Sequence, residues 1–269
     1  MRRACKYFKS FDLGMKSAFE YRLNFFLSLA SALFPIFIQY FMWKAIYHSA
    51  GSAKVYGYDF TQMMIYVVMS GVVSKIVATG FEYEIAREIK EGGLSRFITR
   101  PIFYGPHKLL FFLGEKAMPT LLAILVAVLI LAIASWQGIY TLDISNIQLF
   151  PLSLLLALLI HFMIFFCISA AAFILLEISA FFEVVRILLL VVSGGVFPLD
   201  IFGEQALRIL KFLPFQYIIY FPTKLLAGTV PHAQIPEGIS MQILWSLVLA
   251  ILAHFVWRKG MKHYTGFGG

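Results

Sequence analysis

Charged residues are scarce in this sequence. Asp, Glu, Lys and Arg make up 13% of the 269 residues and apolar residues make up 61%, whereas soluble domains have roughly 25% charged and roughly 45–50% apolar residues. This composition excludes an ordinary soluble domain. The apolar residues occur in separate blocks of about 20 residues, the length with which a helix crosses the roughly 30 Å hydrocarbon core of a bilayer. We expect helices rather than strands, because an open sheet edge in lipid would leave hydrogen bonds unmade.

The usual signatures of bound cofactors and bond chemistry are also missing. The sequence has no G-x-x-x-x-G-K-[ST] phosphate loop, and the Gly92-Gly93 pair lacks the lysine that would reach a phosphate. The histidines never fall at metal-ligand spacing with another histidine or cysteine. A G-x-S-x-G serine elbow is absent as well. We therefore expect no metal, no directly bound ATP and no catalytic residues in this chain.

Six apolar blocks have the length of membrane spans. They cover residues 24–47, 61–80, 109–136, 150–176, 180–196 and 242–257. Glu177, Glu183 and Arg186 interrupt the region between the fourth and fifth blocks. Burying one such charge at mid-bilayer costs about 2.5–3.5 kcal/mol, so a tight turn at the membrane surface is expected there. The sequence thus predicts an all-α polytopic membrane protein, with residues 1–269 forming a single domain of six transmembrane helices.

The net charge of +8 would suit a nucleic-acid binder, but the basic residues gather in the N-terminal tail, the connection after the second block and the C-terminal end. Lysine and arginine concentrate in this way on the cytoplasmic side of membrane proteins. We expect both termini in the cytoplasm and no nucleic-acid partner. Residues 1–23 are basic and amphipathic, and the apolar block that follows lacks a small-residue cleavage site. This pattern indicates an interfacial helix rather than a signal peptide.

The cytoplasmic connection, residues 82–108, begins with a short amphipathic helix. Ile85 and Ile89 form an apolar strip at helical spacing, and charged residues occupy the other faces. Gly92 and Gly93 end the helix, and Arg100-Pro101 predicts an extended turn before the third span. From these residues alone, two interpretations remain open. The helix either joins two spans along the membrane surface or protrudes into a groove of a soluble partner.

The outer connection, residues 198–228, follows a break in the fifth block. Gly194 and Gly195 loosen the helix there, and Pro198 ends it because proline lacks a backbone donor and clashes with the preceding turn. Two helical stretches, residues 204–213 and 215–226, lie on either side of Pro214. They are too short to span, so an outer re-entrant helical hairpin is predicted. Its lysines and tyrosines are typical of interfacial anchors, and contact with a transported molecule is the alternative.

Lys75 lies inside the second predicted span. A basic side chain at this depth is a candidate contact for an anionic substrate. The alternative is that Lys75 extends its side chain toward the nearby cytoplasmic surface.

Several of these segments together resemble the permeases of type-2 ABC exporters, in the bacterial branch of six-span subunits with unassigned or drug-like substrates. The matching residues are 87–94 with Arg100-Pro101, 193–200, 213–217, 220–228 and 257–260.

The resemblance implies a function for both connections. The cytoplasmic connection would be the coupling helix that docks on the ATPase subunit, through Arg87, Glu88, Glu91, Gly92, Gly93, Leu94 and Arg96, with Arg100 and Pro101 setting its angle to the third span. The outer hairpin would form the outer gate, with Gly194, Gly195, Pro198, Pro214 and Tyr217 as hinge or gate residues.

The resemblance also implies an assembly. The chain would be a non-catalytic permease in the bacterial cytoplasmic (inner) membrane, paired with a second permease that is identical or a sister chain. Two cytoplasmic ABC ATPase subunits would bind ATP and Mg and drive export. The alternatives are a channel or secondary transporter that works without ATP, and an intramembrane enzyme.

Overall fold

The computed structural model describes residues 2–20, 22–98, 103–136, 138, 148–175 and 177–264. Over these residues the regular secondary structure is helical, apart from one isolated bridge between Val55 and Tyr58. The α-helices are α1 (Arg2–Glu20), α2 (Arg22–Ala50), α3 (Phe60–Val77), α4 (Phe81–Lys90), α5 (Ser95–Ile98), α6 (Tyr104–Trp136), α7 (Phe150–Ser169), α8 (Ser179–Val192), α9 (Gly203–Lys211), α10 (Tyr220–Leu226) and α11 (Ile235–Met261). The predicted all-α fold is confirmed.

Four helical segments in the described part of the chain are long and apolar enough to cross a membrane: Phe60–Lys90, Tyr104–Trp136, Phe150–Phe173 and His232–Met261. They contain the predicted second, third and sixth spans and nearly all of the fourth, which ends at Phe173 rather than at residue 176. The first predicted span falls within α2, which has 29 residues. The fifth is shorter than expected, because α8 ends at Val192 and has 14 residues, which rise only about 21 Å.

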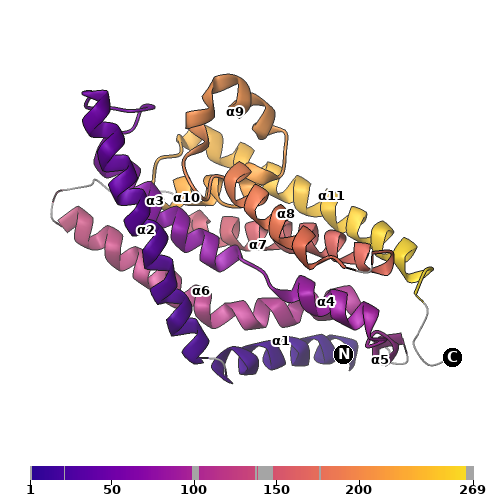
Figure 1. The fold of residues 1–269 in the computed structure, drawn as a ribbon. Coiled ribbons are helices and arrows are strands. Elements are labelled where there is room, and N and C mark those ends of the chain that lie inside the picture. Colours follow the sequence, from indigo (N-terminus) through magenta and orange to yellow (C-terminus); the bar gives the residue numbers. More distant parts are fainter. Residues whose placement is uncertain are drawn as a thin grey trace.

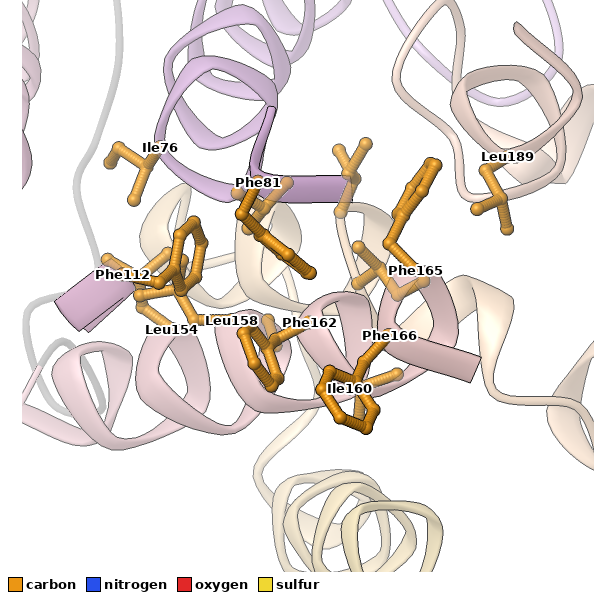
Figure 2. Packing of buried hydrophobic residues seen from close by; sticks show 14 of the residues in the cluster. Ile76, Phe81, Phe112, Leu154, Leu158, Ile160, Phe162, Phe165, Phe166 and Leu189 are labelled. Carbon is orange, nitrogen blue, oxygen red and sulfur yellow. The ribbon is translucent and has the colours of Figure 1, made fainter. Parts of the chain in front are cut away.

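Helix α7 lies at the centre of the core. Its side chains are apolar on nearly every side, as expected of a helix that other elements surround. Phe162 of α7 lies 4.5 Å from Phe81 of α4 and 5.6 Å from Phe112 of α6, measured between ring centroids. Figure 2 shows these rings together with Phe165 and Phe166 of the same helix. The start of α4 is therefore packed directly against the central helix.

Helix α1 lies along the first part of α6 (Figure 1). Two glycines allow this close approach. A Cβ atom on Gly14 would lie 2.0 Å from the carbonyl oxygen of Phe111, and one on Gly114 would lie 2.1 Å from that of Phe11. Ser10 Oγ and His107 Nδ1 are 2.7 Å apart across the same contact. The amphipathic helix predicted from residues 1–23 is thus packed against α6.

The elements gather at two ends of the molecule (Figure 1). Helices α4 and α5 share one end with the start of α1 and the end of α11, and Ser95 Oγ lies 3.1 Å from Tyr264 Oη. We call this the α4 end. The outer connection with α9 lies away from it, next to the loop between α2 and α3, where Tyr58 bonds to Asp200. We call this the α9 end.

Candidate functional site

The α4–α5 segment, residues 81–98, is a helix, a tight turn and a second short helix. Helix α4 ends at Lys90, and Gly92 follows with a φ of 77°, a conformation that costs glycine little. The backbone N–H of Leu94 then bonds back to the Glu88 carbonyl at 3.2 Å. The helix therefore ends just before the glycine pair, as the sequence predicts.

The predicted docking residues divide into exposed and buried groups. Arg87, Glu91 and Arg96 are exposed, and Gly92 and Gly93 are partly exposed beside them. Glu88 and Leu94 are 8% and 2% exposed. In this structure neither of these two side chains is on the surface that a partner would meet. Arg100 and Pro101 lie outside the described residues.

Glu88 joins α4 to α6. Its carboxylate accepts a hydrogen bond from Tyr104 Oη at 2.5 Å and lies 3.1 Å from Lys108 Nζ. Lys108 Nζ also lies 2.8 Å from Glu84, and its side chain is 5% exposed. The Tyr104 ring stacks on Trp257 of α11, with centroids 4.7 Å apart. These contacts, which we call the Glu88–Lys108 junction, fix α4 to two long helices.

A second ionic contact joins α4 to α8. Arg186 donates to Glu82 at 2.5 Å and to Glu183 at 3.0 Å, and Tyr83 donates to Glu183. Glu82 has no exposed side-chain surface. Glu177 lies in the break before α8, where the sequence predicts a turn, and Glu183 and Arg186 lie within α8, where carboxylates from α4 and α8 neutralise the guanidinium. We call this contact the Glu82–Arg186 junction.

At the α9 end, hydroxyl groups converge on one carboxylate. Asp200 accepts from Tyr58 Oη at 2.5 Å and from Tyr220 Oη at 2.8 Å. Lys224 Nζ lies 3.2 Å from Tyr220 Oη and 3.8 Å from Asp200. Burial, followed by the neighbouring carboxylate, raises the pKa of Tyr58 and of Tyr220 above the usual value of 10.0. This arrangement, which we call the Asp200 cluster, ties the outer connection to the α2–α3 loop.

Gly194 and Gly195 lie where side chains would not fit. Gly194 has a φ of 83°, and a Cβ atom on it would lie 2.8 Å from Tyr66 Oη. Its carbonyl oxygen accepts a hydrogen bond from that hydroxyl at 2.6 Å. A Cβ atom on Gly195 would lie 2.5 Å from the Leu190 side chain. The structure therefore gives the glycine pair a packing role. The predicted hinge role stays a prediction.

The other predicted gate residues belong to the same region. Pro198 precedes the 3₁₀ turn Leu199–Phe202, and Pro214 precedes the 3₁₀ turn Phe215–Tyr217. Tyr217 is 3% exposed and its hydroxyl donates to the Lys211 carbonyl at 2.8 Å. Gln242 of α11 donates to the Tyr217 carbonyl at 2.9 Å. The outer connection is thus anchored to the last long helix.

Lys75 is exposed near the end of α3 and lines a pocket of about 630 Å³. Lys108 and Lys116 of α6 line the same pocket. The structure therefore brings Lys75 together with two further lysines that are distant in sequence.

A model of the ABC-2 family transporter proteins matches residues 33–268 of the chain. This match includes the α4–α5 segment, the outer connection and all four helical segments that are long and apolar enough to span. The chain belongs to the ABC-2 transporter family. A search of curated proteins gave no match to it.

Membership of the ABC-2 transporter family indicates what the helical fold does. The chain is the membrane subunit, or permease, of an ABC transporter, and such subunits associate with ATPase subunits. The apolar helices are membrane-spanning elements of this ABC-2 permease.

Sequence reasoning had counted Lys108 and Arg186 only as cytoplasmic charges. It had quoted Asp200 within the segment 193–200 and missed its partner Tyr58, which is 142 positions away. The isolated charges within or beside apolar blocks indicated that such contacts exist, because a charge in apolar surroundings needs a partner. The identity of each partner depended on the tertiary fold.

Proposed function

We propose that this ABC-2 permease is one of two membrane subunits of an ATP-driven exporter, and that its α4–α5 segment docks on a cytoplasmic ATPase subunit. The second permease is an identical or a sister chain, and each of two ATPase subunits binds ATP and Mg. The proposal includes six spans, both termini in the cytoplasm and a location in the bacterial inner membrane.

One observation carries this proposal. The α4–α5 segment has an exposed tip with Arg87 and Glu91, while its opposite side is fixed by a buried ion pair to α6 and a partly buried one to α8. A helix that only joined two spans would not need two such ionic junctions. Buried pairs are costly to form and costly to break, so they hold α4 in a defined position relative to both helices.

The arrangement suits transmission of force. A displacement of the exposed tip by a closing ATPase pair would pass through the Glu88–Lys108 junction to α6 and through the Glu82–Arg186 junction to α8. Helix α8 leads directly into Gly194 and the outer connection. Movement at the α4 end would thereby reach the α9 end, where the proposed gate residues lie. The chain itself would do no bond chemistry.

The two ends also fit the proposed orientation. The start of α1 and residue Tyr264 lie beside α5, so both ends of the described chain are on the docking side. Clusters of lysine and arginine favour the cytoplasmic side.

A charge exchange tests the docking surface. Arg87 and Glu91 are four residues apart on α4 and exposed, so Arg87→Glu with Glu91→Arg keeps the net charge and the helical spacing. We expect about tenfold less ATPase subunit to co-purify with the tagged permease, because charges that complement those of the partner are reversed. The matched control is Glu204→Arg with Arg208→Glu, an exposed pair with the same spacing on α9. Equal recovery of the ATPase with both variants would overturn the docking assignment.

A further inference from the structure

The pocket beside Lys75 has the features of a binding site for an anion. Its volume of about 630 Å³ falls within the roughly 300–1,000 Å³ of typical ligand sites. The walls come from three places: Ser17 of α1, the break between α3 and α4, and α6 from Lys108 to Pro119. It is separate from the exposed tip of α4 and from the Asp200 cluster.

Two of its three lysines are available for a ligand. Lys108 is occupied, because it is bonded to Glu84 and Glu88. Within the described part of the chain, neither Lys75 nor Lys116 lies within 4.0 Å of a carboxylate oxygen. Glu115 also lines the pocket and offsets one of the two positive charges. Lys116 is partly buried, with its Nζ 5.8 Å from the centroid of the Phe112 ring, and burying an ammonium without an anion beside it is costly.

The break between α3 and α4 contributes hydrogen-bond donors. Helix α4 starts after Gly80 without a side-chain cap, and Gly80 and Phe81 line the pocket. An uncapped helix N-terminus carries partial positive charge and free N–H groups, which bind phosphate readily. Thr79 also lines the pocket, and its hydroxyl is shielded from solvent without a hydrogen-bond partner in the described structure. A phosphate oxygen would satisfy both kinds of donor.

The pocket lies where the surface of α6 changes from charged to apolar. Lys108, Glu115 and Lys116 precede Met118, and the exposed side chains from Met118 to Ile133 are mainly large and apolar. In a membrane protein this change marks the depth of the lipid headgroups. Basic pockets between spans on the cytoplasmic side bind anionic headgroups.

We propose that Lys75, Lys116, Thr79 and the N-terminus of α4 bind the phosphate group of an anionic phospholipid. A lipid held there would contact α1, α4 and α6 together. Because α4 belongs to the proposed docking segment, a bound headgroup would stabilise the position of that segment. The site itself requires no ATPase subunit, so its test is independent of docking.

The test compares lipid binding by the purified full-length protein, using native mass spectrometry with dioleoyl phosphatidylglycerol or dioleoyl phosphatidylcholine. Wild-type protein should retain phosphatidylglycerol in preference to phosphatidylcholine. Lys75→Gln with Lys116→Gln should weaken phosphatidylglycerol binding about tenfold or more, since charged hydrogen bonds are lost. The control is Lys44→Gln with Lys54→Gln, which removes the same charge from exposed positions in α2 and in the α2–α3 loop and should leave binding unchanged.

Two further variants keep the test decisive if the glutamine variant folds poorly. Lys75→Arg with Lys116→Arg keeps both charges and should retain binding. Thr79→Val removes only the hydroxyl and should weaken binding about fivefold.

Inorganic phosphate is the second probe, in a thermal-shift titration. If it alone gives the lysine-dependent stabilisation, the source is a free anion and the lipid assignment is wrong. Equal phosphatidylglycerol binding by wild type, Lys75→Gln with Lys116→Gln, and Thr79→Val would overturn the site.

Discussion

The two ends of this ABC-2 permease are held together by different chemistry. At the α4 end, a buried ion pair joins α4 to α6 and a partly buried one joins α4 to α8, with Glu82 fully enclosed and Lys108 nearly so. At the α9 end, tyrosine hydroxyls converge on the half-buried Asp200, and glycines allow close backbone packing. Breaking a buried ion pair costs about 3–5 kcal/mol because it leaves an uncompensated charge, whereas losing one hydrogen bond to a charged group such as the Asp200 carboxylate costs about 1.5–3 kcal/mol.

This difference suggests a division of work between the ends. The α4 end is suited to move as a unit with α6 and α8, because its junctions are too costly to open in each cycle. The α9 end is suited to rearrange, because single hydrogen bonds there can be exchanged at lower cost. Gating would then occur at the Asp200 cluster, and force transfer at the two ionic junctions.

The largest effect is expected from Lys108→Met. The substitution leaves Glu84 and Glu88 without their buried cation, and we expect a loss of about 3–5 kcal/mol in the free energy of unfolding. Denaturation in detergent, followed by circular dichroism, measures it. Arg96→Met is the control, because Arg96 lies 3.9 Å from Glu88 and its side chain is 67% exposed. It should cost less than about 1 kcal/mol. Similar losses for the two variants would show that Lys108 stabilises the fold no more than the exposed Arg96 does.

Gly194→Ala should have the next largest effect. The new Cβ would meet both Tyr66 and Tyr220 in addition to requiring a positive φ, for a combined cost of about 1–3 kcal/mol. Gly203→Ala separates these causes, because Gly203 has a φ of 82° and open space around it. Thermal unfolding of both variants should show a larger decrease for Gly194→Ala. An equal decrease would mean that only the backbone conformation matters at Gly194.

Alkaline pH should weaken the α9 end. The pKa of Tyr58 is raised in the folded state by burial and by Asp200, so the stabilisation is complete below pH 10 and is lost as the pH rises above 10 toward the folded-state pKa. Tyr58→Phe removes this group and should reduce the alkaline loss of stability, at a cost of about 1.5 kcal/mol at neutral pH, because its hydroxyl bonds to a carboxylate. Unfolding measured between pH 8 and about 11 tests this. An unchanged pH profile in Tyr58→Phe would argue against the Asp200 cluster.

The smallest effect is expected from Arg208→Ala on α9. Arg208 lies 3.5 Å from Glu204, and both side chains are highly exposed. Solvent screens such a pair, and a change below about 0.5 kcal/mol in the free energy of unfolding is expected. A loss as large as that of Lys108→Met would show that buried pairs in this protein contribute no more to stability than exposed ones.

The long helices could be predicted because their signal is local. Apolar runs located α3, α6, α7 and α11, and the glycine pair located the end of α4. The short α8 was overestimated, because Gly194 and Gly195 were read as loosening a helix that in fact ends before them. Glycine is used there because Tyr66 and Leu190 leave no room for a side chain, a fact of tertiary packing.

The candidate site was harder to predict. Glu88 and Leu94 are assigned to the docking surface because the resemblance to ABC exporter permeases places the docking segment there. Their burial depends on Tyr104, Lys108 and the core helices, which come later in the chain. The pairing of α1 with α6 likewise depends on two glycines 100 positions apart, Gly14 and Gly114. Local periodicity carries no information about such partners.

The central claim is that the exposed tip of α4 contacts the ATPase subunit, and site-specific photo-cross-linking tests it most directly. A photoreactive amino acid replaces Arg87 in one variant and Arg208 in another, and both are irradiated in native membranes that contain the assembled transporter. The account predicts a covalent product between permease and ATPase subunit from position 87 and none from position 208. A product from position 208 alone, in complexes that still co-purify with the ATPase, would contradict it.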